Sequence, residues 1–394
     1  MLAAPTQASD VSADRATERA GRYIVVLHDD ASASRGADRA RGLGAEVGHV
    51  YHAALKGYAA RMSDAVAARL AQDPRVAWVQ RDGTATTTAQ SLPTGINRVD
   101  AELSTTARID GVDQRVDVDV AVIDTGIDLD HPDLNVYRTG AKNCSTGRSA
   151  DDGNGHGTHV AGTVGAIDDT NGVVGVAPGA RVWPVRVLNA NGSGSFSDII
   201  CGIDYVTANA DKIEVANMSL GGSGSDDGNC GRSNNDAMHQ AICNSVAAGV
   251  TYAVAAGNSA EDAARHVPAA YDEVITVSAL ADFDGLPGGG AAPTCRSDVD
   301  DTFANFSNHG ADIDLIAPGV CINSTWKGGG YNTISGTSMA SPHVAGGAAL
   351  YLATHPGASP STVKSALQSA GTTDWNASDD PDGTKERLLN VGAF

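Results

Sequence analysis

Three short motifs in the chain carry the side chains that acyl transfer requires. Asp124 ends an apolar run, His156 lies in the glycine-rich segment Gly-Asn-Gly-His156, and Ser338 begins a segment of small residues. Acyl transfer needs a hydroxyl nucleophile, an imidazole that removes its proton and a carboxylate that orients the imidazole. The chain supplies all three, in the order Asp, His, Ser.

Each motif taken alone also has a purely structural explanation. Asp124 would fit a turn aspartate, His156 a structural histidine and Ser338 an ordinary helix N-cap. The surrounding residues do not match other common sites, because the chain lacks a dinucleotide GxGxxG after a strand, a zinc HExxH and an esterase GxSxG at Ser338. The combination of the three motifs is what favours catalysis.

The three motifs closely resemble the signatures of subtilisin-like serine proteases (peptidase family S8), in the branch of proteinase K and aqualysin. The matching segments are Val-Ile-Asp124-Thr-Gly, Gly-His156-Gly-Thr-His-Val-Ala-Gly and Gly-Thr-Ser338-Met-Ala-Ser-Pro-His-Val-Ala-Gly. The resemblance covers about residues 95–392, and residues 22–81 resemble the inhibitor propeptide of subtilisins. It implies a secreted serine endopeptidase that forms an acyl-enzyme on Ser338 and needs no cofactor for catalysis.

The same resemblance assigns the remaining site residues. Asn258, in Ala255-Ala-Gly-Asn258, matches the amide that forms the oxyanion hole together with Ser338. Backbone rails that pair with a peptide substrate are expected at Gly192, Ser193, Gly194 and Ser195 and at Ser219, Leu220, Gly221 and Gly222. Uncharged S1 walls, formed by Ser219–Gly221 and by Ala255, Ala256 and Gly257, imply a preference for apolar or aromatic P1 residues, and Phe196 is expected to edge S4. The alternative is that these glycines serve packing only.

Calcium is also implied by the resemblance, through Asp314, which aligns with a calcium ligand of the proteinase K branch. A surface or turn aspartate is the alternative. The net charge of −20 favours bound cations, yet a solvated or salt-adapted acidic surface explains that charge equally well.

The N-terminal part of the chain predicts a small domain of its own. Residues 1–21 are polar and Ala-rich and indicate a disordered leader. Strands, helices and turns then follow in the order β-α-β-β-α-β, which predicts a ferredoxin-like α+β propeptide domain over 22–84. The expected elements are a strand at 23–27, a helix at 37–43, two strands within 46–62, a helix at 64–71 and a strand at 76–80.

The rest of the chain predicts an α/β catalytic domain. Residues 85–95 have no core-forming pattern and read as an exposed processing linker before a domain at 96–394. In that domain short apolar runs alternate with Ala/Gly-rich helical stretches, which predicts a mostly parallel sheet covered on both faces, the three-layer subtilisin-like fold. Ligands bind at the carboxyl ends of the strands in such sheets.

Composition limits the partners and the compartment. An acidic chain opposes binding to nucleic acid and to anionic membranes, and no apolar run is long enough to span a bilayer. The resemblance to subtilisin-like proteases implies a monomer whose partners are polypeptide substrates and its own propeptide. No signal peptide is visible at the start of the sequence.

The chain has six cysteines, an even number that fits an oxidising compartment but allows 15 connectivities. Cys230 and Cys243 flank a short Asn-rich, helix-like stretch, and Cys295 and Cys321 flank another segment. Cys144 and Cys201 then remain by elimination. Buried free thiols are the alternative.

Two other functions compete with the zymogen of a secreted endopeptidase. A non-catalytic homologue would lack a catalytic residue, and none is missing. An esterase or peptide ligase could use the same triad, because acyl-enzymes partition according to the acceptor. For the zymogen we expect self-cleavage between about Ala85 and Ser91, followed by inhibition by residues 22–84.

Overall fold

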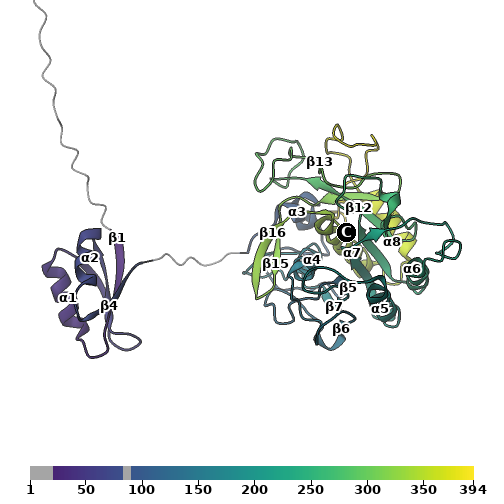
Figure 1. The fold of residues 1–394 in the computed structure, drawn as a ribbon. Helices are drawn as coiled ribbons and strands as arrows, with labels where there is room; N and C mark the ends of the chain where they lie inside the picture. Colours follow the sequence, from purple (N-terminus) through teal and green to yellow (C-terminus); the bar gives the residue numbers. More distant parts are fainter. Residues whose placement is uncertain (1–20, 83–89) are drawn as a thin grey trace, which may run out of the picture. The chain divides into compact units, whose positions relative to one another are not determined.

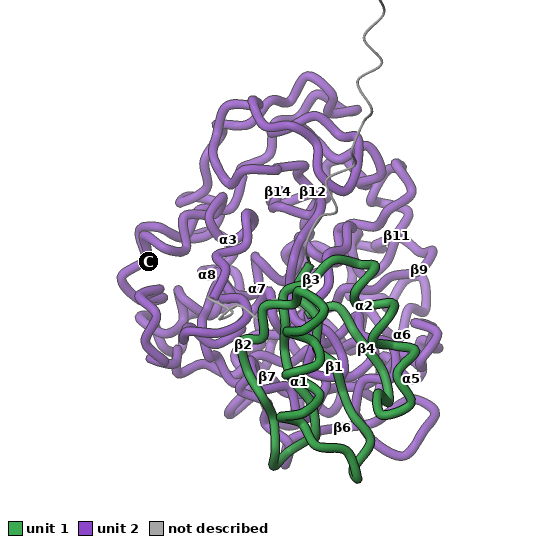
Figure 2. The backbone as a smooth tube through the Cα atoms, turned by 90° about the vertical axis from the view of Figure 1, so that its left-hand side faces the viewer, with its two compact units in different colours: residues 1–87 green, residues 88–394 purple. Residues whose placement is uncertain are grey.

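The computed structural model describes residues 21–82 and 90–394. The chain divides into two compact units, Met1–Thr87 and Thr88–Phe394 (Figure 2), and each is described by itself. The predicted leader lies outside the described residues except for Gly21, which begins the first strand. Most of the predicted cleavage segment from Ala85 to Ser91 also lies outside them.

The N-terminal unit has the predicted β-α-β-β-α-β order (Figure 1). Its strands form one antiparallel sheet in the order β2-β3-β1-β4, which is the expected ferredoxin-like arrangement. The helix α1 begins before the predicted start at Ala37, because the Ser32 side chain caps it by accepting from Arg35 N at 3.5 Å. The elements are β1 (Gly21–Leu27), α1 (Ala33–Gly42), β2 (Glu46–Tyr51), β3 (Gly57–Met62), α2 (Asp64–Ala71) and β4 (Val76–Arg81).

The second unit is built on an eight-stranded sheet in the order β13-β12-β10-β8-β5-β7-β6, with β14 also paired to β12. Every pair is parallel except β12 with β13. The strands are β5 (Asp119–Asp124), β6 (Lys142–Asn143), β7 (Arg181–Arg186), β8 (Ile213–Met218), β10 (Thr251–Ala255), β12 (Ile275–Ala281), β13 (Thr302–Phe303) and β14 (Leu315–Pro318).

Helices cover both faces of this sheet, as the alternating pattern predicts (Figure 1). Val120 and Val122 of β5 point to one core, with α4 (His156–Gly165), α7 (Thr337–Thr354) and α8 (Pro360–Ala370). Ala121 and Ile123 point to the other core, with α5 (Phe196–Thr207) and α6 (Ala237–Ala247). The expected three-layer α/β fold is therefore confirmed, and β5 is buried along its whole length.

Short elements complete the second unit. The strands β9 (Gly222–Ser223) and β11 (His266–Val267) form one antiparallel pair, and β15 (Ile322–Trp326) and β16 (Gly330–Ile334) form another. The end of the predicted linker belongs to this unit: Ser91 N donates to Gly172 O at 2.9 Å, and Thr94 begins the helix α3 (Thr94–Arg98).

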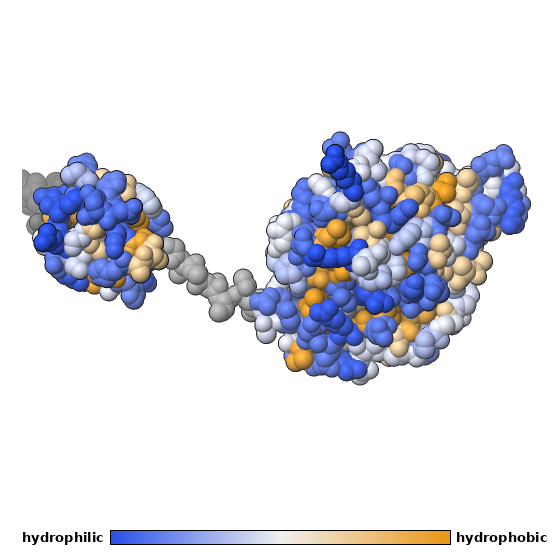
Figure 3. All heavy atoms as spheres, turned by 90° about the horizontal axis from the view of Figure 1, so that it is seen from below, coloured by the Kyte–Doolittle hydropathy of each residue, from blue (hydrophilic) through white to orange (hydrophobic). Residues whose placement is uncertain are grey.

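All three predicted cysteine pairs are formed. Disulfides join Cys144 to Cys201, Cys230 to Cys243 and Cys295 to Cys321. Within residues 21–82 and 90–394, no helix has both the length and the apolar character needed to cross a membrane. The face drawn in Figure 3 is mostly hydrophilic, with hydrophobic side chains scattered between polar ones.

Candidate active site

Asp124 is the last residue of β5, which lies between β7 and β8 in the sheet. The chain continues from β5 to strands on both sides of it, so the carboxyl end of β5 is a switch point of the kind that binds ligands in α/β folds. The Asp124 side chain is fully buried, and its Oδ1 accepts from Thr125 N at 2.6 Å. The fold thus fixes a carboxylate at the edge of the expected cleft.

Asp152 builds the turn that presents His156. Its Oδ1 accepts from the backbone N–H groups of Asn154 (2.9 Å) and Gly155 (2.8 Å), and its Oδ2 accepts from the hydroxyl of Thr158 (2.6 Å). Gly155 has φ +116, and a Cβ there would lie 2.4 Å from the Trp326 ring, so only glycine fits before the histidine. Our sequence analysis did not assign this role to Asp152.

His156 and Asp124 form the pair that a general base requires. His156 Nδ1 lies 2.8 Å from Asp124 Oδ1 and 3.0 Å from Oδ2, so Nδ1 carries the proton and Nε2 is left as the basic nitrogen. Burial disfavours the imidazolium, but the Asp124 carboxylate and its hydrogen bond outweigh burial and raise the pKa of His156. The ring is oriented and polarised to accept a proton.

Ser338 is the second residue of α7, where its backbone N–H has no acceptor within the helix. Pro342 lies in the second turn of α7, and its missing N–H leaves the Ser338 carbonyl without a backbone donor from the helix. The Ser219 hydroxyl donates to that carbonyl at 2.8 Å. The Ser338 hydroxyl in turn donates to Ser219 O at 3.3 Å. No hydrogen bond joins the hydroxyl of Ser338 to His156, and both of these residues belong to the described part of the chain.

Buried polar side chains hold this corner of α7 against β8. Asn217, which is fully buried, donates to the Ser219 hydroxyl at 2.9 Å and accepts from the Ser341 hydroxyl at 2.8 Å. The start of α7 is therefore tied to the sheet by side chains as well as by packing. Ser219, which was predicted to bind substrate, thus also links Asn217 of the sheet to the Ser338 carbonyl.

Asn258 follows β10 and is oriented by Thr337. Its Oδ1 accepts from Thr337 N at 2.8 Å and from Thr337 Oγ1 at 3.0 Å, which fixes the amide so that its NH₂ group points away from both bonds. Thr337 Oγ1 also accepts from Gly257 N at 3.1 Å. An amide donor fixed in this way beside the Ser338 N–H is the arrangement that stabilises an oxyanion.

Two adjoining cavities run along these residues and share Leu220 and Gly221. The first, of about 270 Å³, is lined by Ala255, Ala256, Gly257, Asn258 and Ser338. His266 and Val267 also line it, and the sequence analysis missed them; His266 Nε2 lies 3.3 Å from Glu261.

The second cavity, of about 490 Å³, contains His156, Ser219 and the predicted rail residues Gly192, Ser193 and Gly194. Phe196 lines it with 46% of its surface exposed. Ser195, at the end of that rail, caps α5 by accepting from Asp198 N at 3.2 Å. Apart from Ser195, every predicted substrate residue therefore lies along one of the two cavities.

Asp314, the predicted calcium ligand, lies elsewhere and contacts a lysine. Lys364 Nζ is 2.8 Å from Asp314 Oδ2 and donates to the carbonyl oxygens of Val274 (2.9 Å) and Asp272 (3.2 Å). The Lys364 ammonium thus occupies the position between three oxygens at which a hard cation would have to bind. The residues around Asp314 do not fit a calcium ion in this structure.

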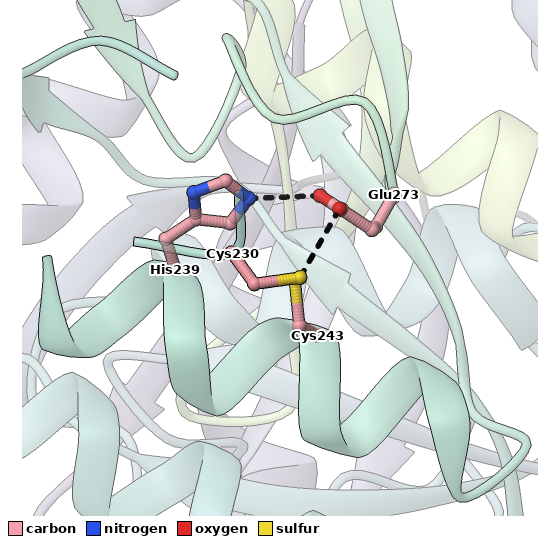
Figure 4. A group of neighbouring side chains, drawn as sticks. All are labelled: Cys230, His239, Cys243 and Glu273. Carbon is pink, nitrogen blue, oxygen red and sulfur yellow. Dashed lines mark hydrogen bonds and ion pairs between the residues drawn. A yellow bond between two sulfur atoms is a disulfide. The ribbon is translucent and has the colours of Figure 1, made fainter. Parts of the chain in front are cut away.

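A second cluster combines cysteines with His239 and Glu273 (Figure 4). His239 Nε2 lies 2.9 Å from Glu273 Oε2, beside the disulfide of Cys230 and Cys243, and its ring stacks on Tyr271 at 4.0 Å. Metal ligation by cysteine requires the thiolate, and a disulfide offers none. In the disulfide-bonded protein this cluster is a hydrogen bond between a histidine and a carboxylate beside a covalent crosslink.

Comparison with known proteins agrees with this geometry. Residues 116–387 match the model of the subtilase family, and residues 22–88 match that of peptidase inhibitor I9. An extracellular serine proteinase of Thermus sp. (strain Rt41A) is 43% identical over 330 residues, 82% of this chain and 73% of that protein. Subtilisin DY of Bacillus licheniformis is 40% identical over 72% of this chain and 93% of its own length.

A solved structure gives the same result for the fold. The crystal structure of a cold adapted subtilisin-like serine proteinase aligns with a TM-score of 0.59 and 34% identity, over 78% of this chain and 99% of that one. The match to the family model covers well over half of the chain and includes all three motifs. The chain belongs to the subtilase family of serine endopeptidases, and within it an inhibitor I9 propeptide domain precedes the subtilase domain.

Proposed function

We propose that Ser338 is the nucleophile, His156 the general base and Asp124 the residue that orients the base. His156 Nε2 removes the Ser338 proton as Oγ attacks the scissile carbonyl, and the resulting imidazolium then protonates the leaving amine. Water repeats the two steps on the acyl-enzyme. The observation that carries this proposal is the fixed bond between His156 Nδ1 and Asp124 beside a serine at a helix N-terminus.

Charge that develops on the carbonyl oxygen is stabilised by the Asn258 amide and the Ser338 N–H. The bonds from Thr337 to Asn258 Oδ1 hold the amide before the reaction, so no reorganisation is needed as the charge forms. In a subtilisin such an amide contributes roughly 10²- to 10³-fold to kcat, a value taken over from that relative.

A fluorophosphonate probe tests the triad. It should label Ser338 stoichiometrically and abolish proteolysis, and the variant Ser338→Ala should take up no label. Ser361→Ala, at an exposed serine of α8, is the matched control and should be labelled like the parent protein. Loss of activity with the label at another residue would refute the assignment.

The cavity next to Ser338 supports a preference for apolar or aromatic P1 residues. Its walls at Leu220, Ala255 and Ala256 carry no charge, and about 270 Å³ is room for a large side chain. Peptides that differ only at P1 should be cleaved with kcat/KM highest for Phe or Leu and lowest for Asp. The proposal is wrong if Asp or Lys at P1 is preferred.

We further propose that the protein is a secreted, monomeric, self-processed zymogen. A compact I9 domain precedes the second unit, and an intramolecular cut is favoured by the high effective concentration of a tethered segment. The named extracellular relative and the net charge of −20 support secretion and argue against nucleic acid or anionic membranes as partners.

The variant Ser338→Ala, made in a protease-free system, tests self-processing. It should accumulate as an uncut precursor, whereas the Ser361→Ala control should be cut between about Ala85 and Ser91. N-terminal sequencing of both products locates the cut. A Ser338→Ala product that begins near residue 88 would show that another protease makes it.

A further inference from the structure

The loop between α8 and the C-terminus gathers acidic side chains away from the catalytic site. Its sequence is Asp380-Pro-Asp382-Gly-Thr-Lys-Glu386, and carboxylate oxygens of Asp380, Asp382 and Glu386 lie within 4.8 Å of one another. The turn is closed by Gly383, with φ +73, and by Thr384 N, which donates to Asp382 Oδ1 at 2.7 Å. Three carboxylates are therefore held together by a tight local turn.

Two of these carboxylates are buried with oxygens that have no hydrogen-bond partner. Glu386 is 6% exposed and Asp380 is 7% exposed. Among the described residues, neither Glu386 oxygen has a partner, nor does Asp380 Oδ2. His309 Nδ1, also without a hydrogen bond, lies 4.0 Å from Asp382 Oδ2 on a neighbouring loop. Buried carboxylates without donors are costly unless a cation or a proton neutralises them.

We propose that Asp380, Asp382 and Glu386 bind a structural calcium ion. Among the described residues, Asp380 Oδ2 and both Glu386 oxygens have no hydrogen-bond partner, and the exposed Asp382 adds a third carboxylate within 4.8 Å of theirs. Calcium takes carboxylates singly or in bidentate fashion at 2.3–2.6 Å and completes a flexible shell with carbonyls and water. Ligand oxygens at opposite sides of such an ion are separated by about 4.6–5.2 Å, which accommodates the observed cluster.

The donor set selects calcium over other metals. The three residues of the cluster, Asp380, Asp382 and Glu386, offer only carboxylate oxygens, whereas zinc and the later transition metals favour imidazole or thiolate ligands. The His309 ring, 4.0 Å from Asp382, contacts the cluster at its edge and does not enter it. Magnesium requires near-ideal octahedral geometry and keeps most of its water, so it has little use for a dry site with a bidentate carboxylate.

The ion would hold residues 380–386 together beside the segment that joins the sheet. Trp375 Nε1 donates to the Glu386 carbonyl at 3.0 Å, and Leu388 bridges to Ile316 of β14. Trp375 and Leu388 belong to a small core with Phe303 of β13. In Figure 1 this segment is the yellow loop beside β13, and Asn376 bridges to Thr302 there. Without the ion, three repelling carboxylates lie directly beside this core.

Terbium luminescence tests the site in the full chain with Ser338→Ala, which prevents autolysis. Trp375 contacts the backbone of Glu386, so excitation of tryptophan should sensitise Tb³⁺ bound there, and Ca²⁺ should displace it. Glu386→Gln and Asp382→Asn should each weaken Tb³⁺ binding at least tenfold. The exposed neighbour Asp379→Asn, which removes the same charge, should change binding less than twofold.

Two further measurements complete the test. Trp375→Phe should remove most of the sensitised signal, and Ca²⁺ should raise the Tm of the parent and of Asp379→Asn but not that of Glu386→Gln. The inference is overturned if Trp375→Phe keeps the signal, because the ion is then elsewhere. It is also overturned if Mg²⁺ displaces Tb³⁺ as well as Ca²⁺ does, or if Glu386→Gln raises Tm without any metal binding, which would indicate a carboxyl pair that shares a proton.

Discussion

Replacing Thr337 by valine isolates the part that one hydroxyl plays in positioning the oxyanion amide. Valine keeps the shape of threonine and removes only the bond from Thr337 Oγ1 to Asn258 Oδ1 (3.0 Å) and the one from Gly257 N (3.1 Å). The bond from Thr337 N to Asn258 remains at 2.8 Å. The amide of Asn258 is then held by one bond where it had two.

A neutral hydrogen bond of this kind contributes about 0.5–1.5 kcal/mol. If all of it is felt in the transition state, kcat falls by about 2- to 13-fold, while KM stays nearly constant because the oxyanion does not exist in the ground state. The loss is far smaller than the roughly 10²- to 10³-fold expected for removing the amide itself.

Steady-state kinetics on a chromogenic peptide should be measured for Thr337→Val, Asn258→Ala and the double variant. Because the hydroxyl acts through the amide, its effect should disappear once Asn258 is alanine. Thr333→Val, at an exposed position of β16, is the matched control and should leave kcat unchanged. An equal drop in kcat with and without Asn258 would refute the reasoning, and so would a change confined to KM.

Three further predictions concern pH, a buried ion pair and a close contact. Because Asp124 raises the pKa of His156 above its usual value near 6.5, kcat/KM should fall as pH drops through that raised pKa; Asp124→Asn should move this acid limb to lower pH. Lys364→Met should lower the free energy of unfolding by about 2–4 kcal/mol in urea titrations near pH 7, and the loss should shrink in acid as Asp314 takes up a proton. Gly157→Ala should prevent formation of active enzyme, since its Cβ would lie 2.1 Å from a backbone carbonyl, and an active, normally folded variant would contradict this.

Residue type and periodicity were sufficient to predict the layers of the fold and the kinds of element that hold the triad. The strand before Asp124 and the small-residue helices at His156 and Ser338 were predicted because each signal lies within a few neighbouring residues. Two of the cysteine pairs were predicted because each flanks a short segment of the chain, and the pair of Cys144 and Cys201 followed by elimination.

Contacts between distant polar residues were not predictable in this way. Nothing near Lys364 indicates that its ammonium reaches Asp314, because the contact depends on how α8 packs against the sheet. Asp152 was given no role, although its hydrogen bonds define the turn that precedes His156. Only the structure links Pro342 of α7 to the Ser338 carbonyl, which accepts from the Ser219 hydroxyl.

The small residues of α4 and α7 affect what a sequence match to this family can say about catalytic activity. A Cβ on Gly346 of α7 would lie 2.6 Å from Val176 Cβ, and one on Gly162 of α4 would lie 2.3 Å from Thr325 Oγ1. Selection for a folded protein therefore preserves these helices whether or not the enzyme is active. A relative that lost its nucleophile would still align over both motifs, so a long match measures common ancestry, and catalytic competence has to be read from the few positions that touch the substrate.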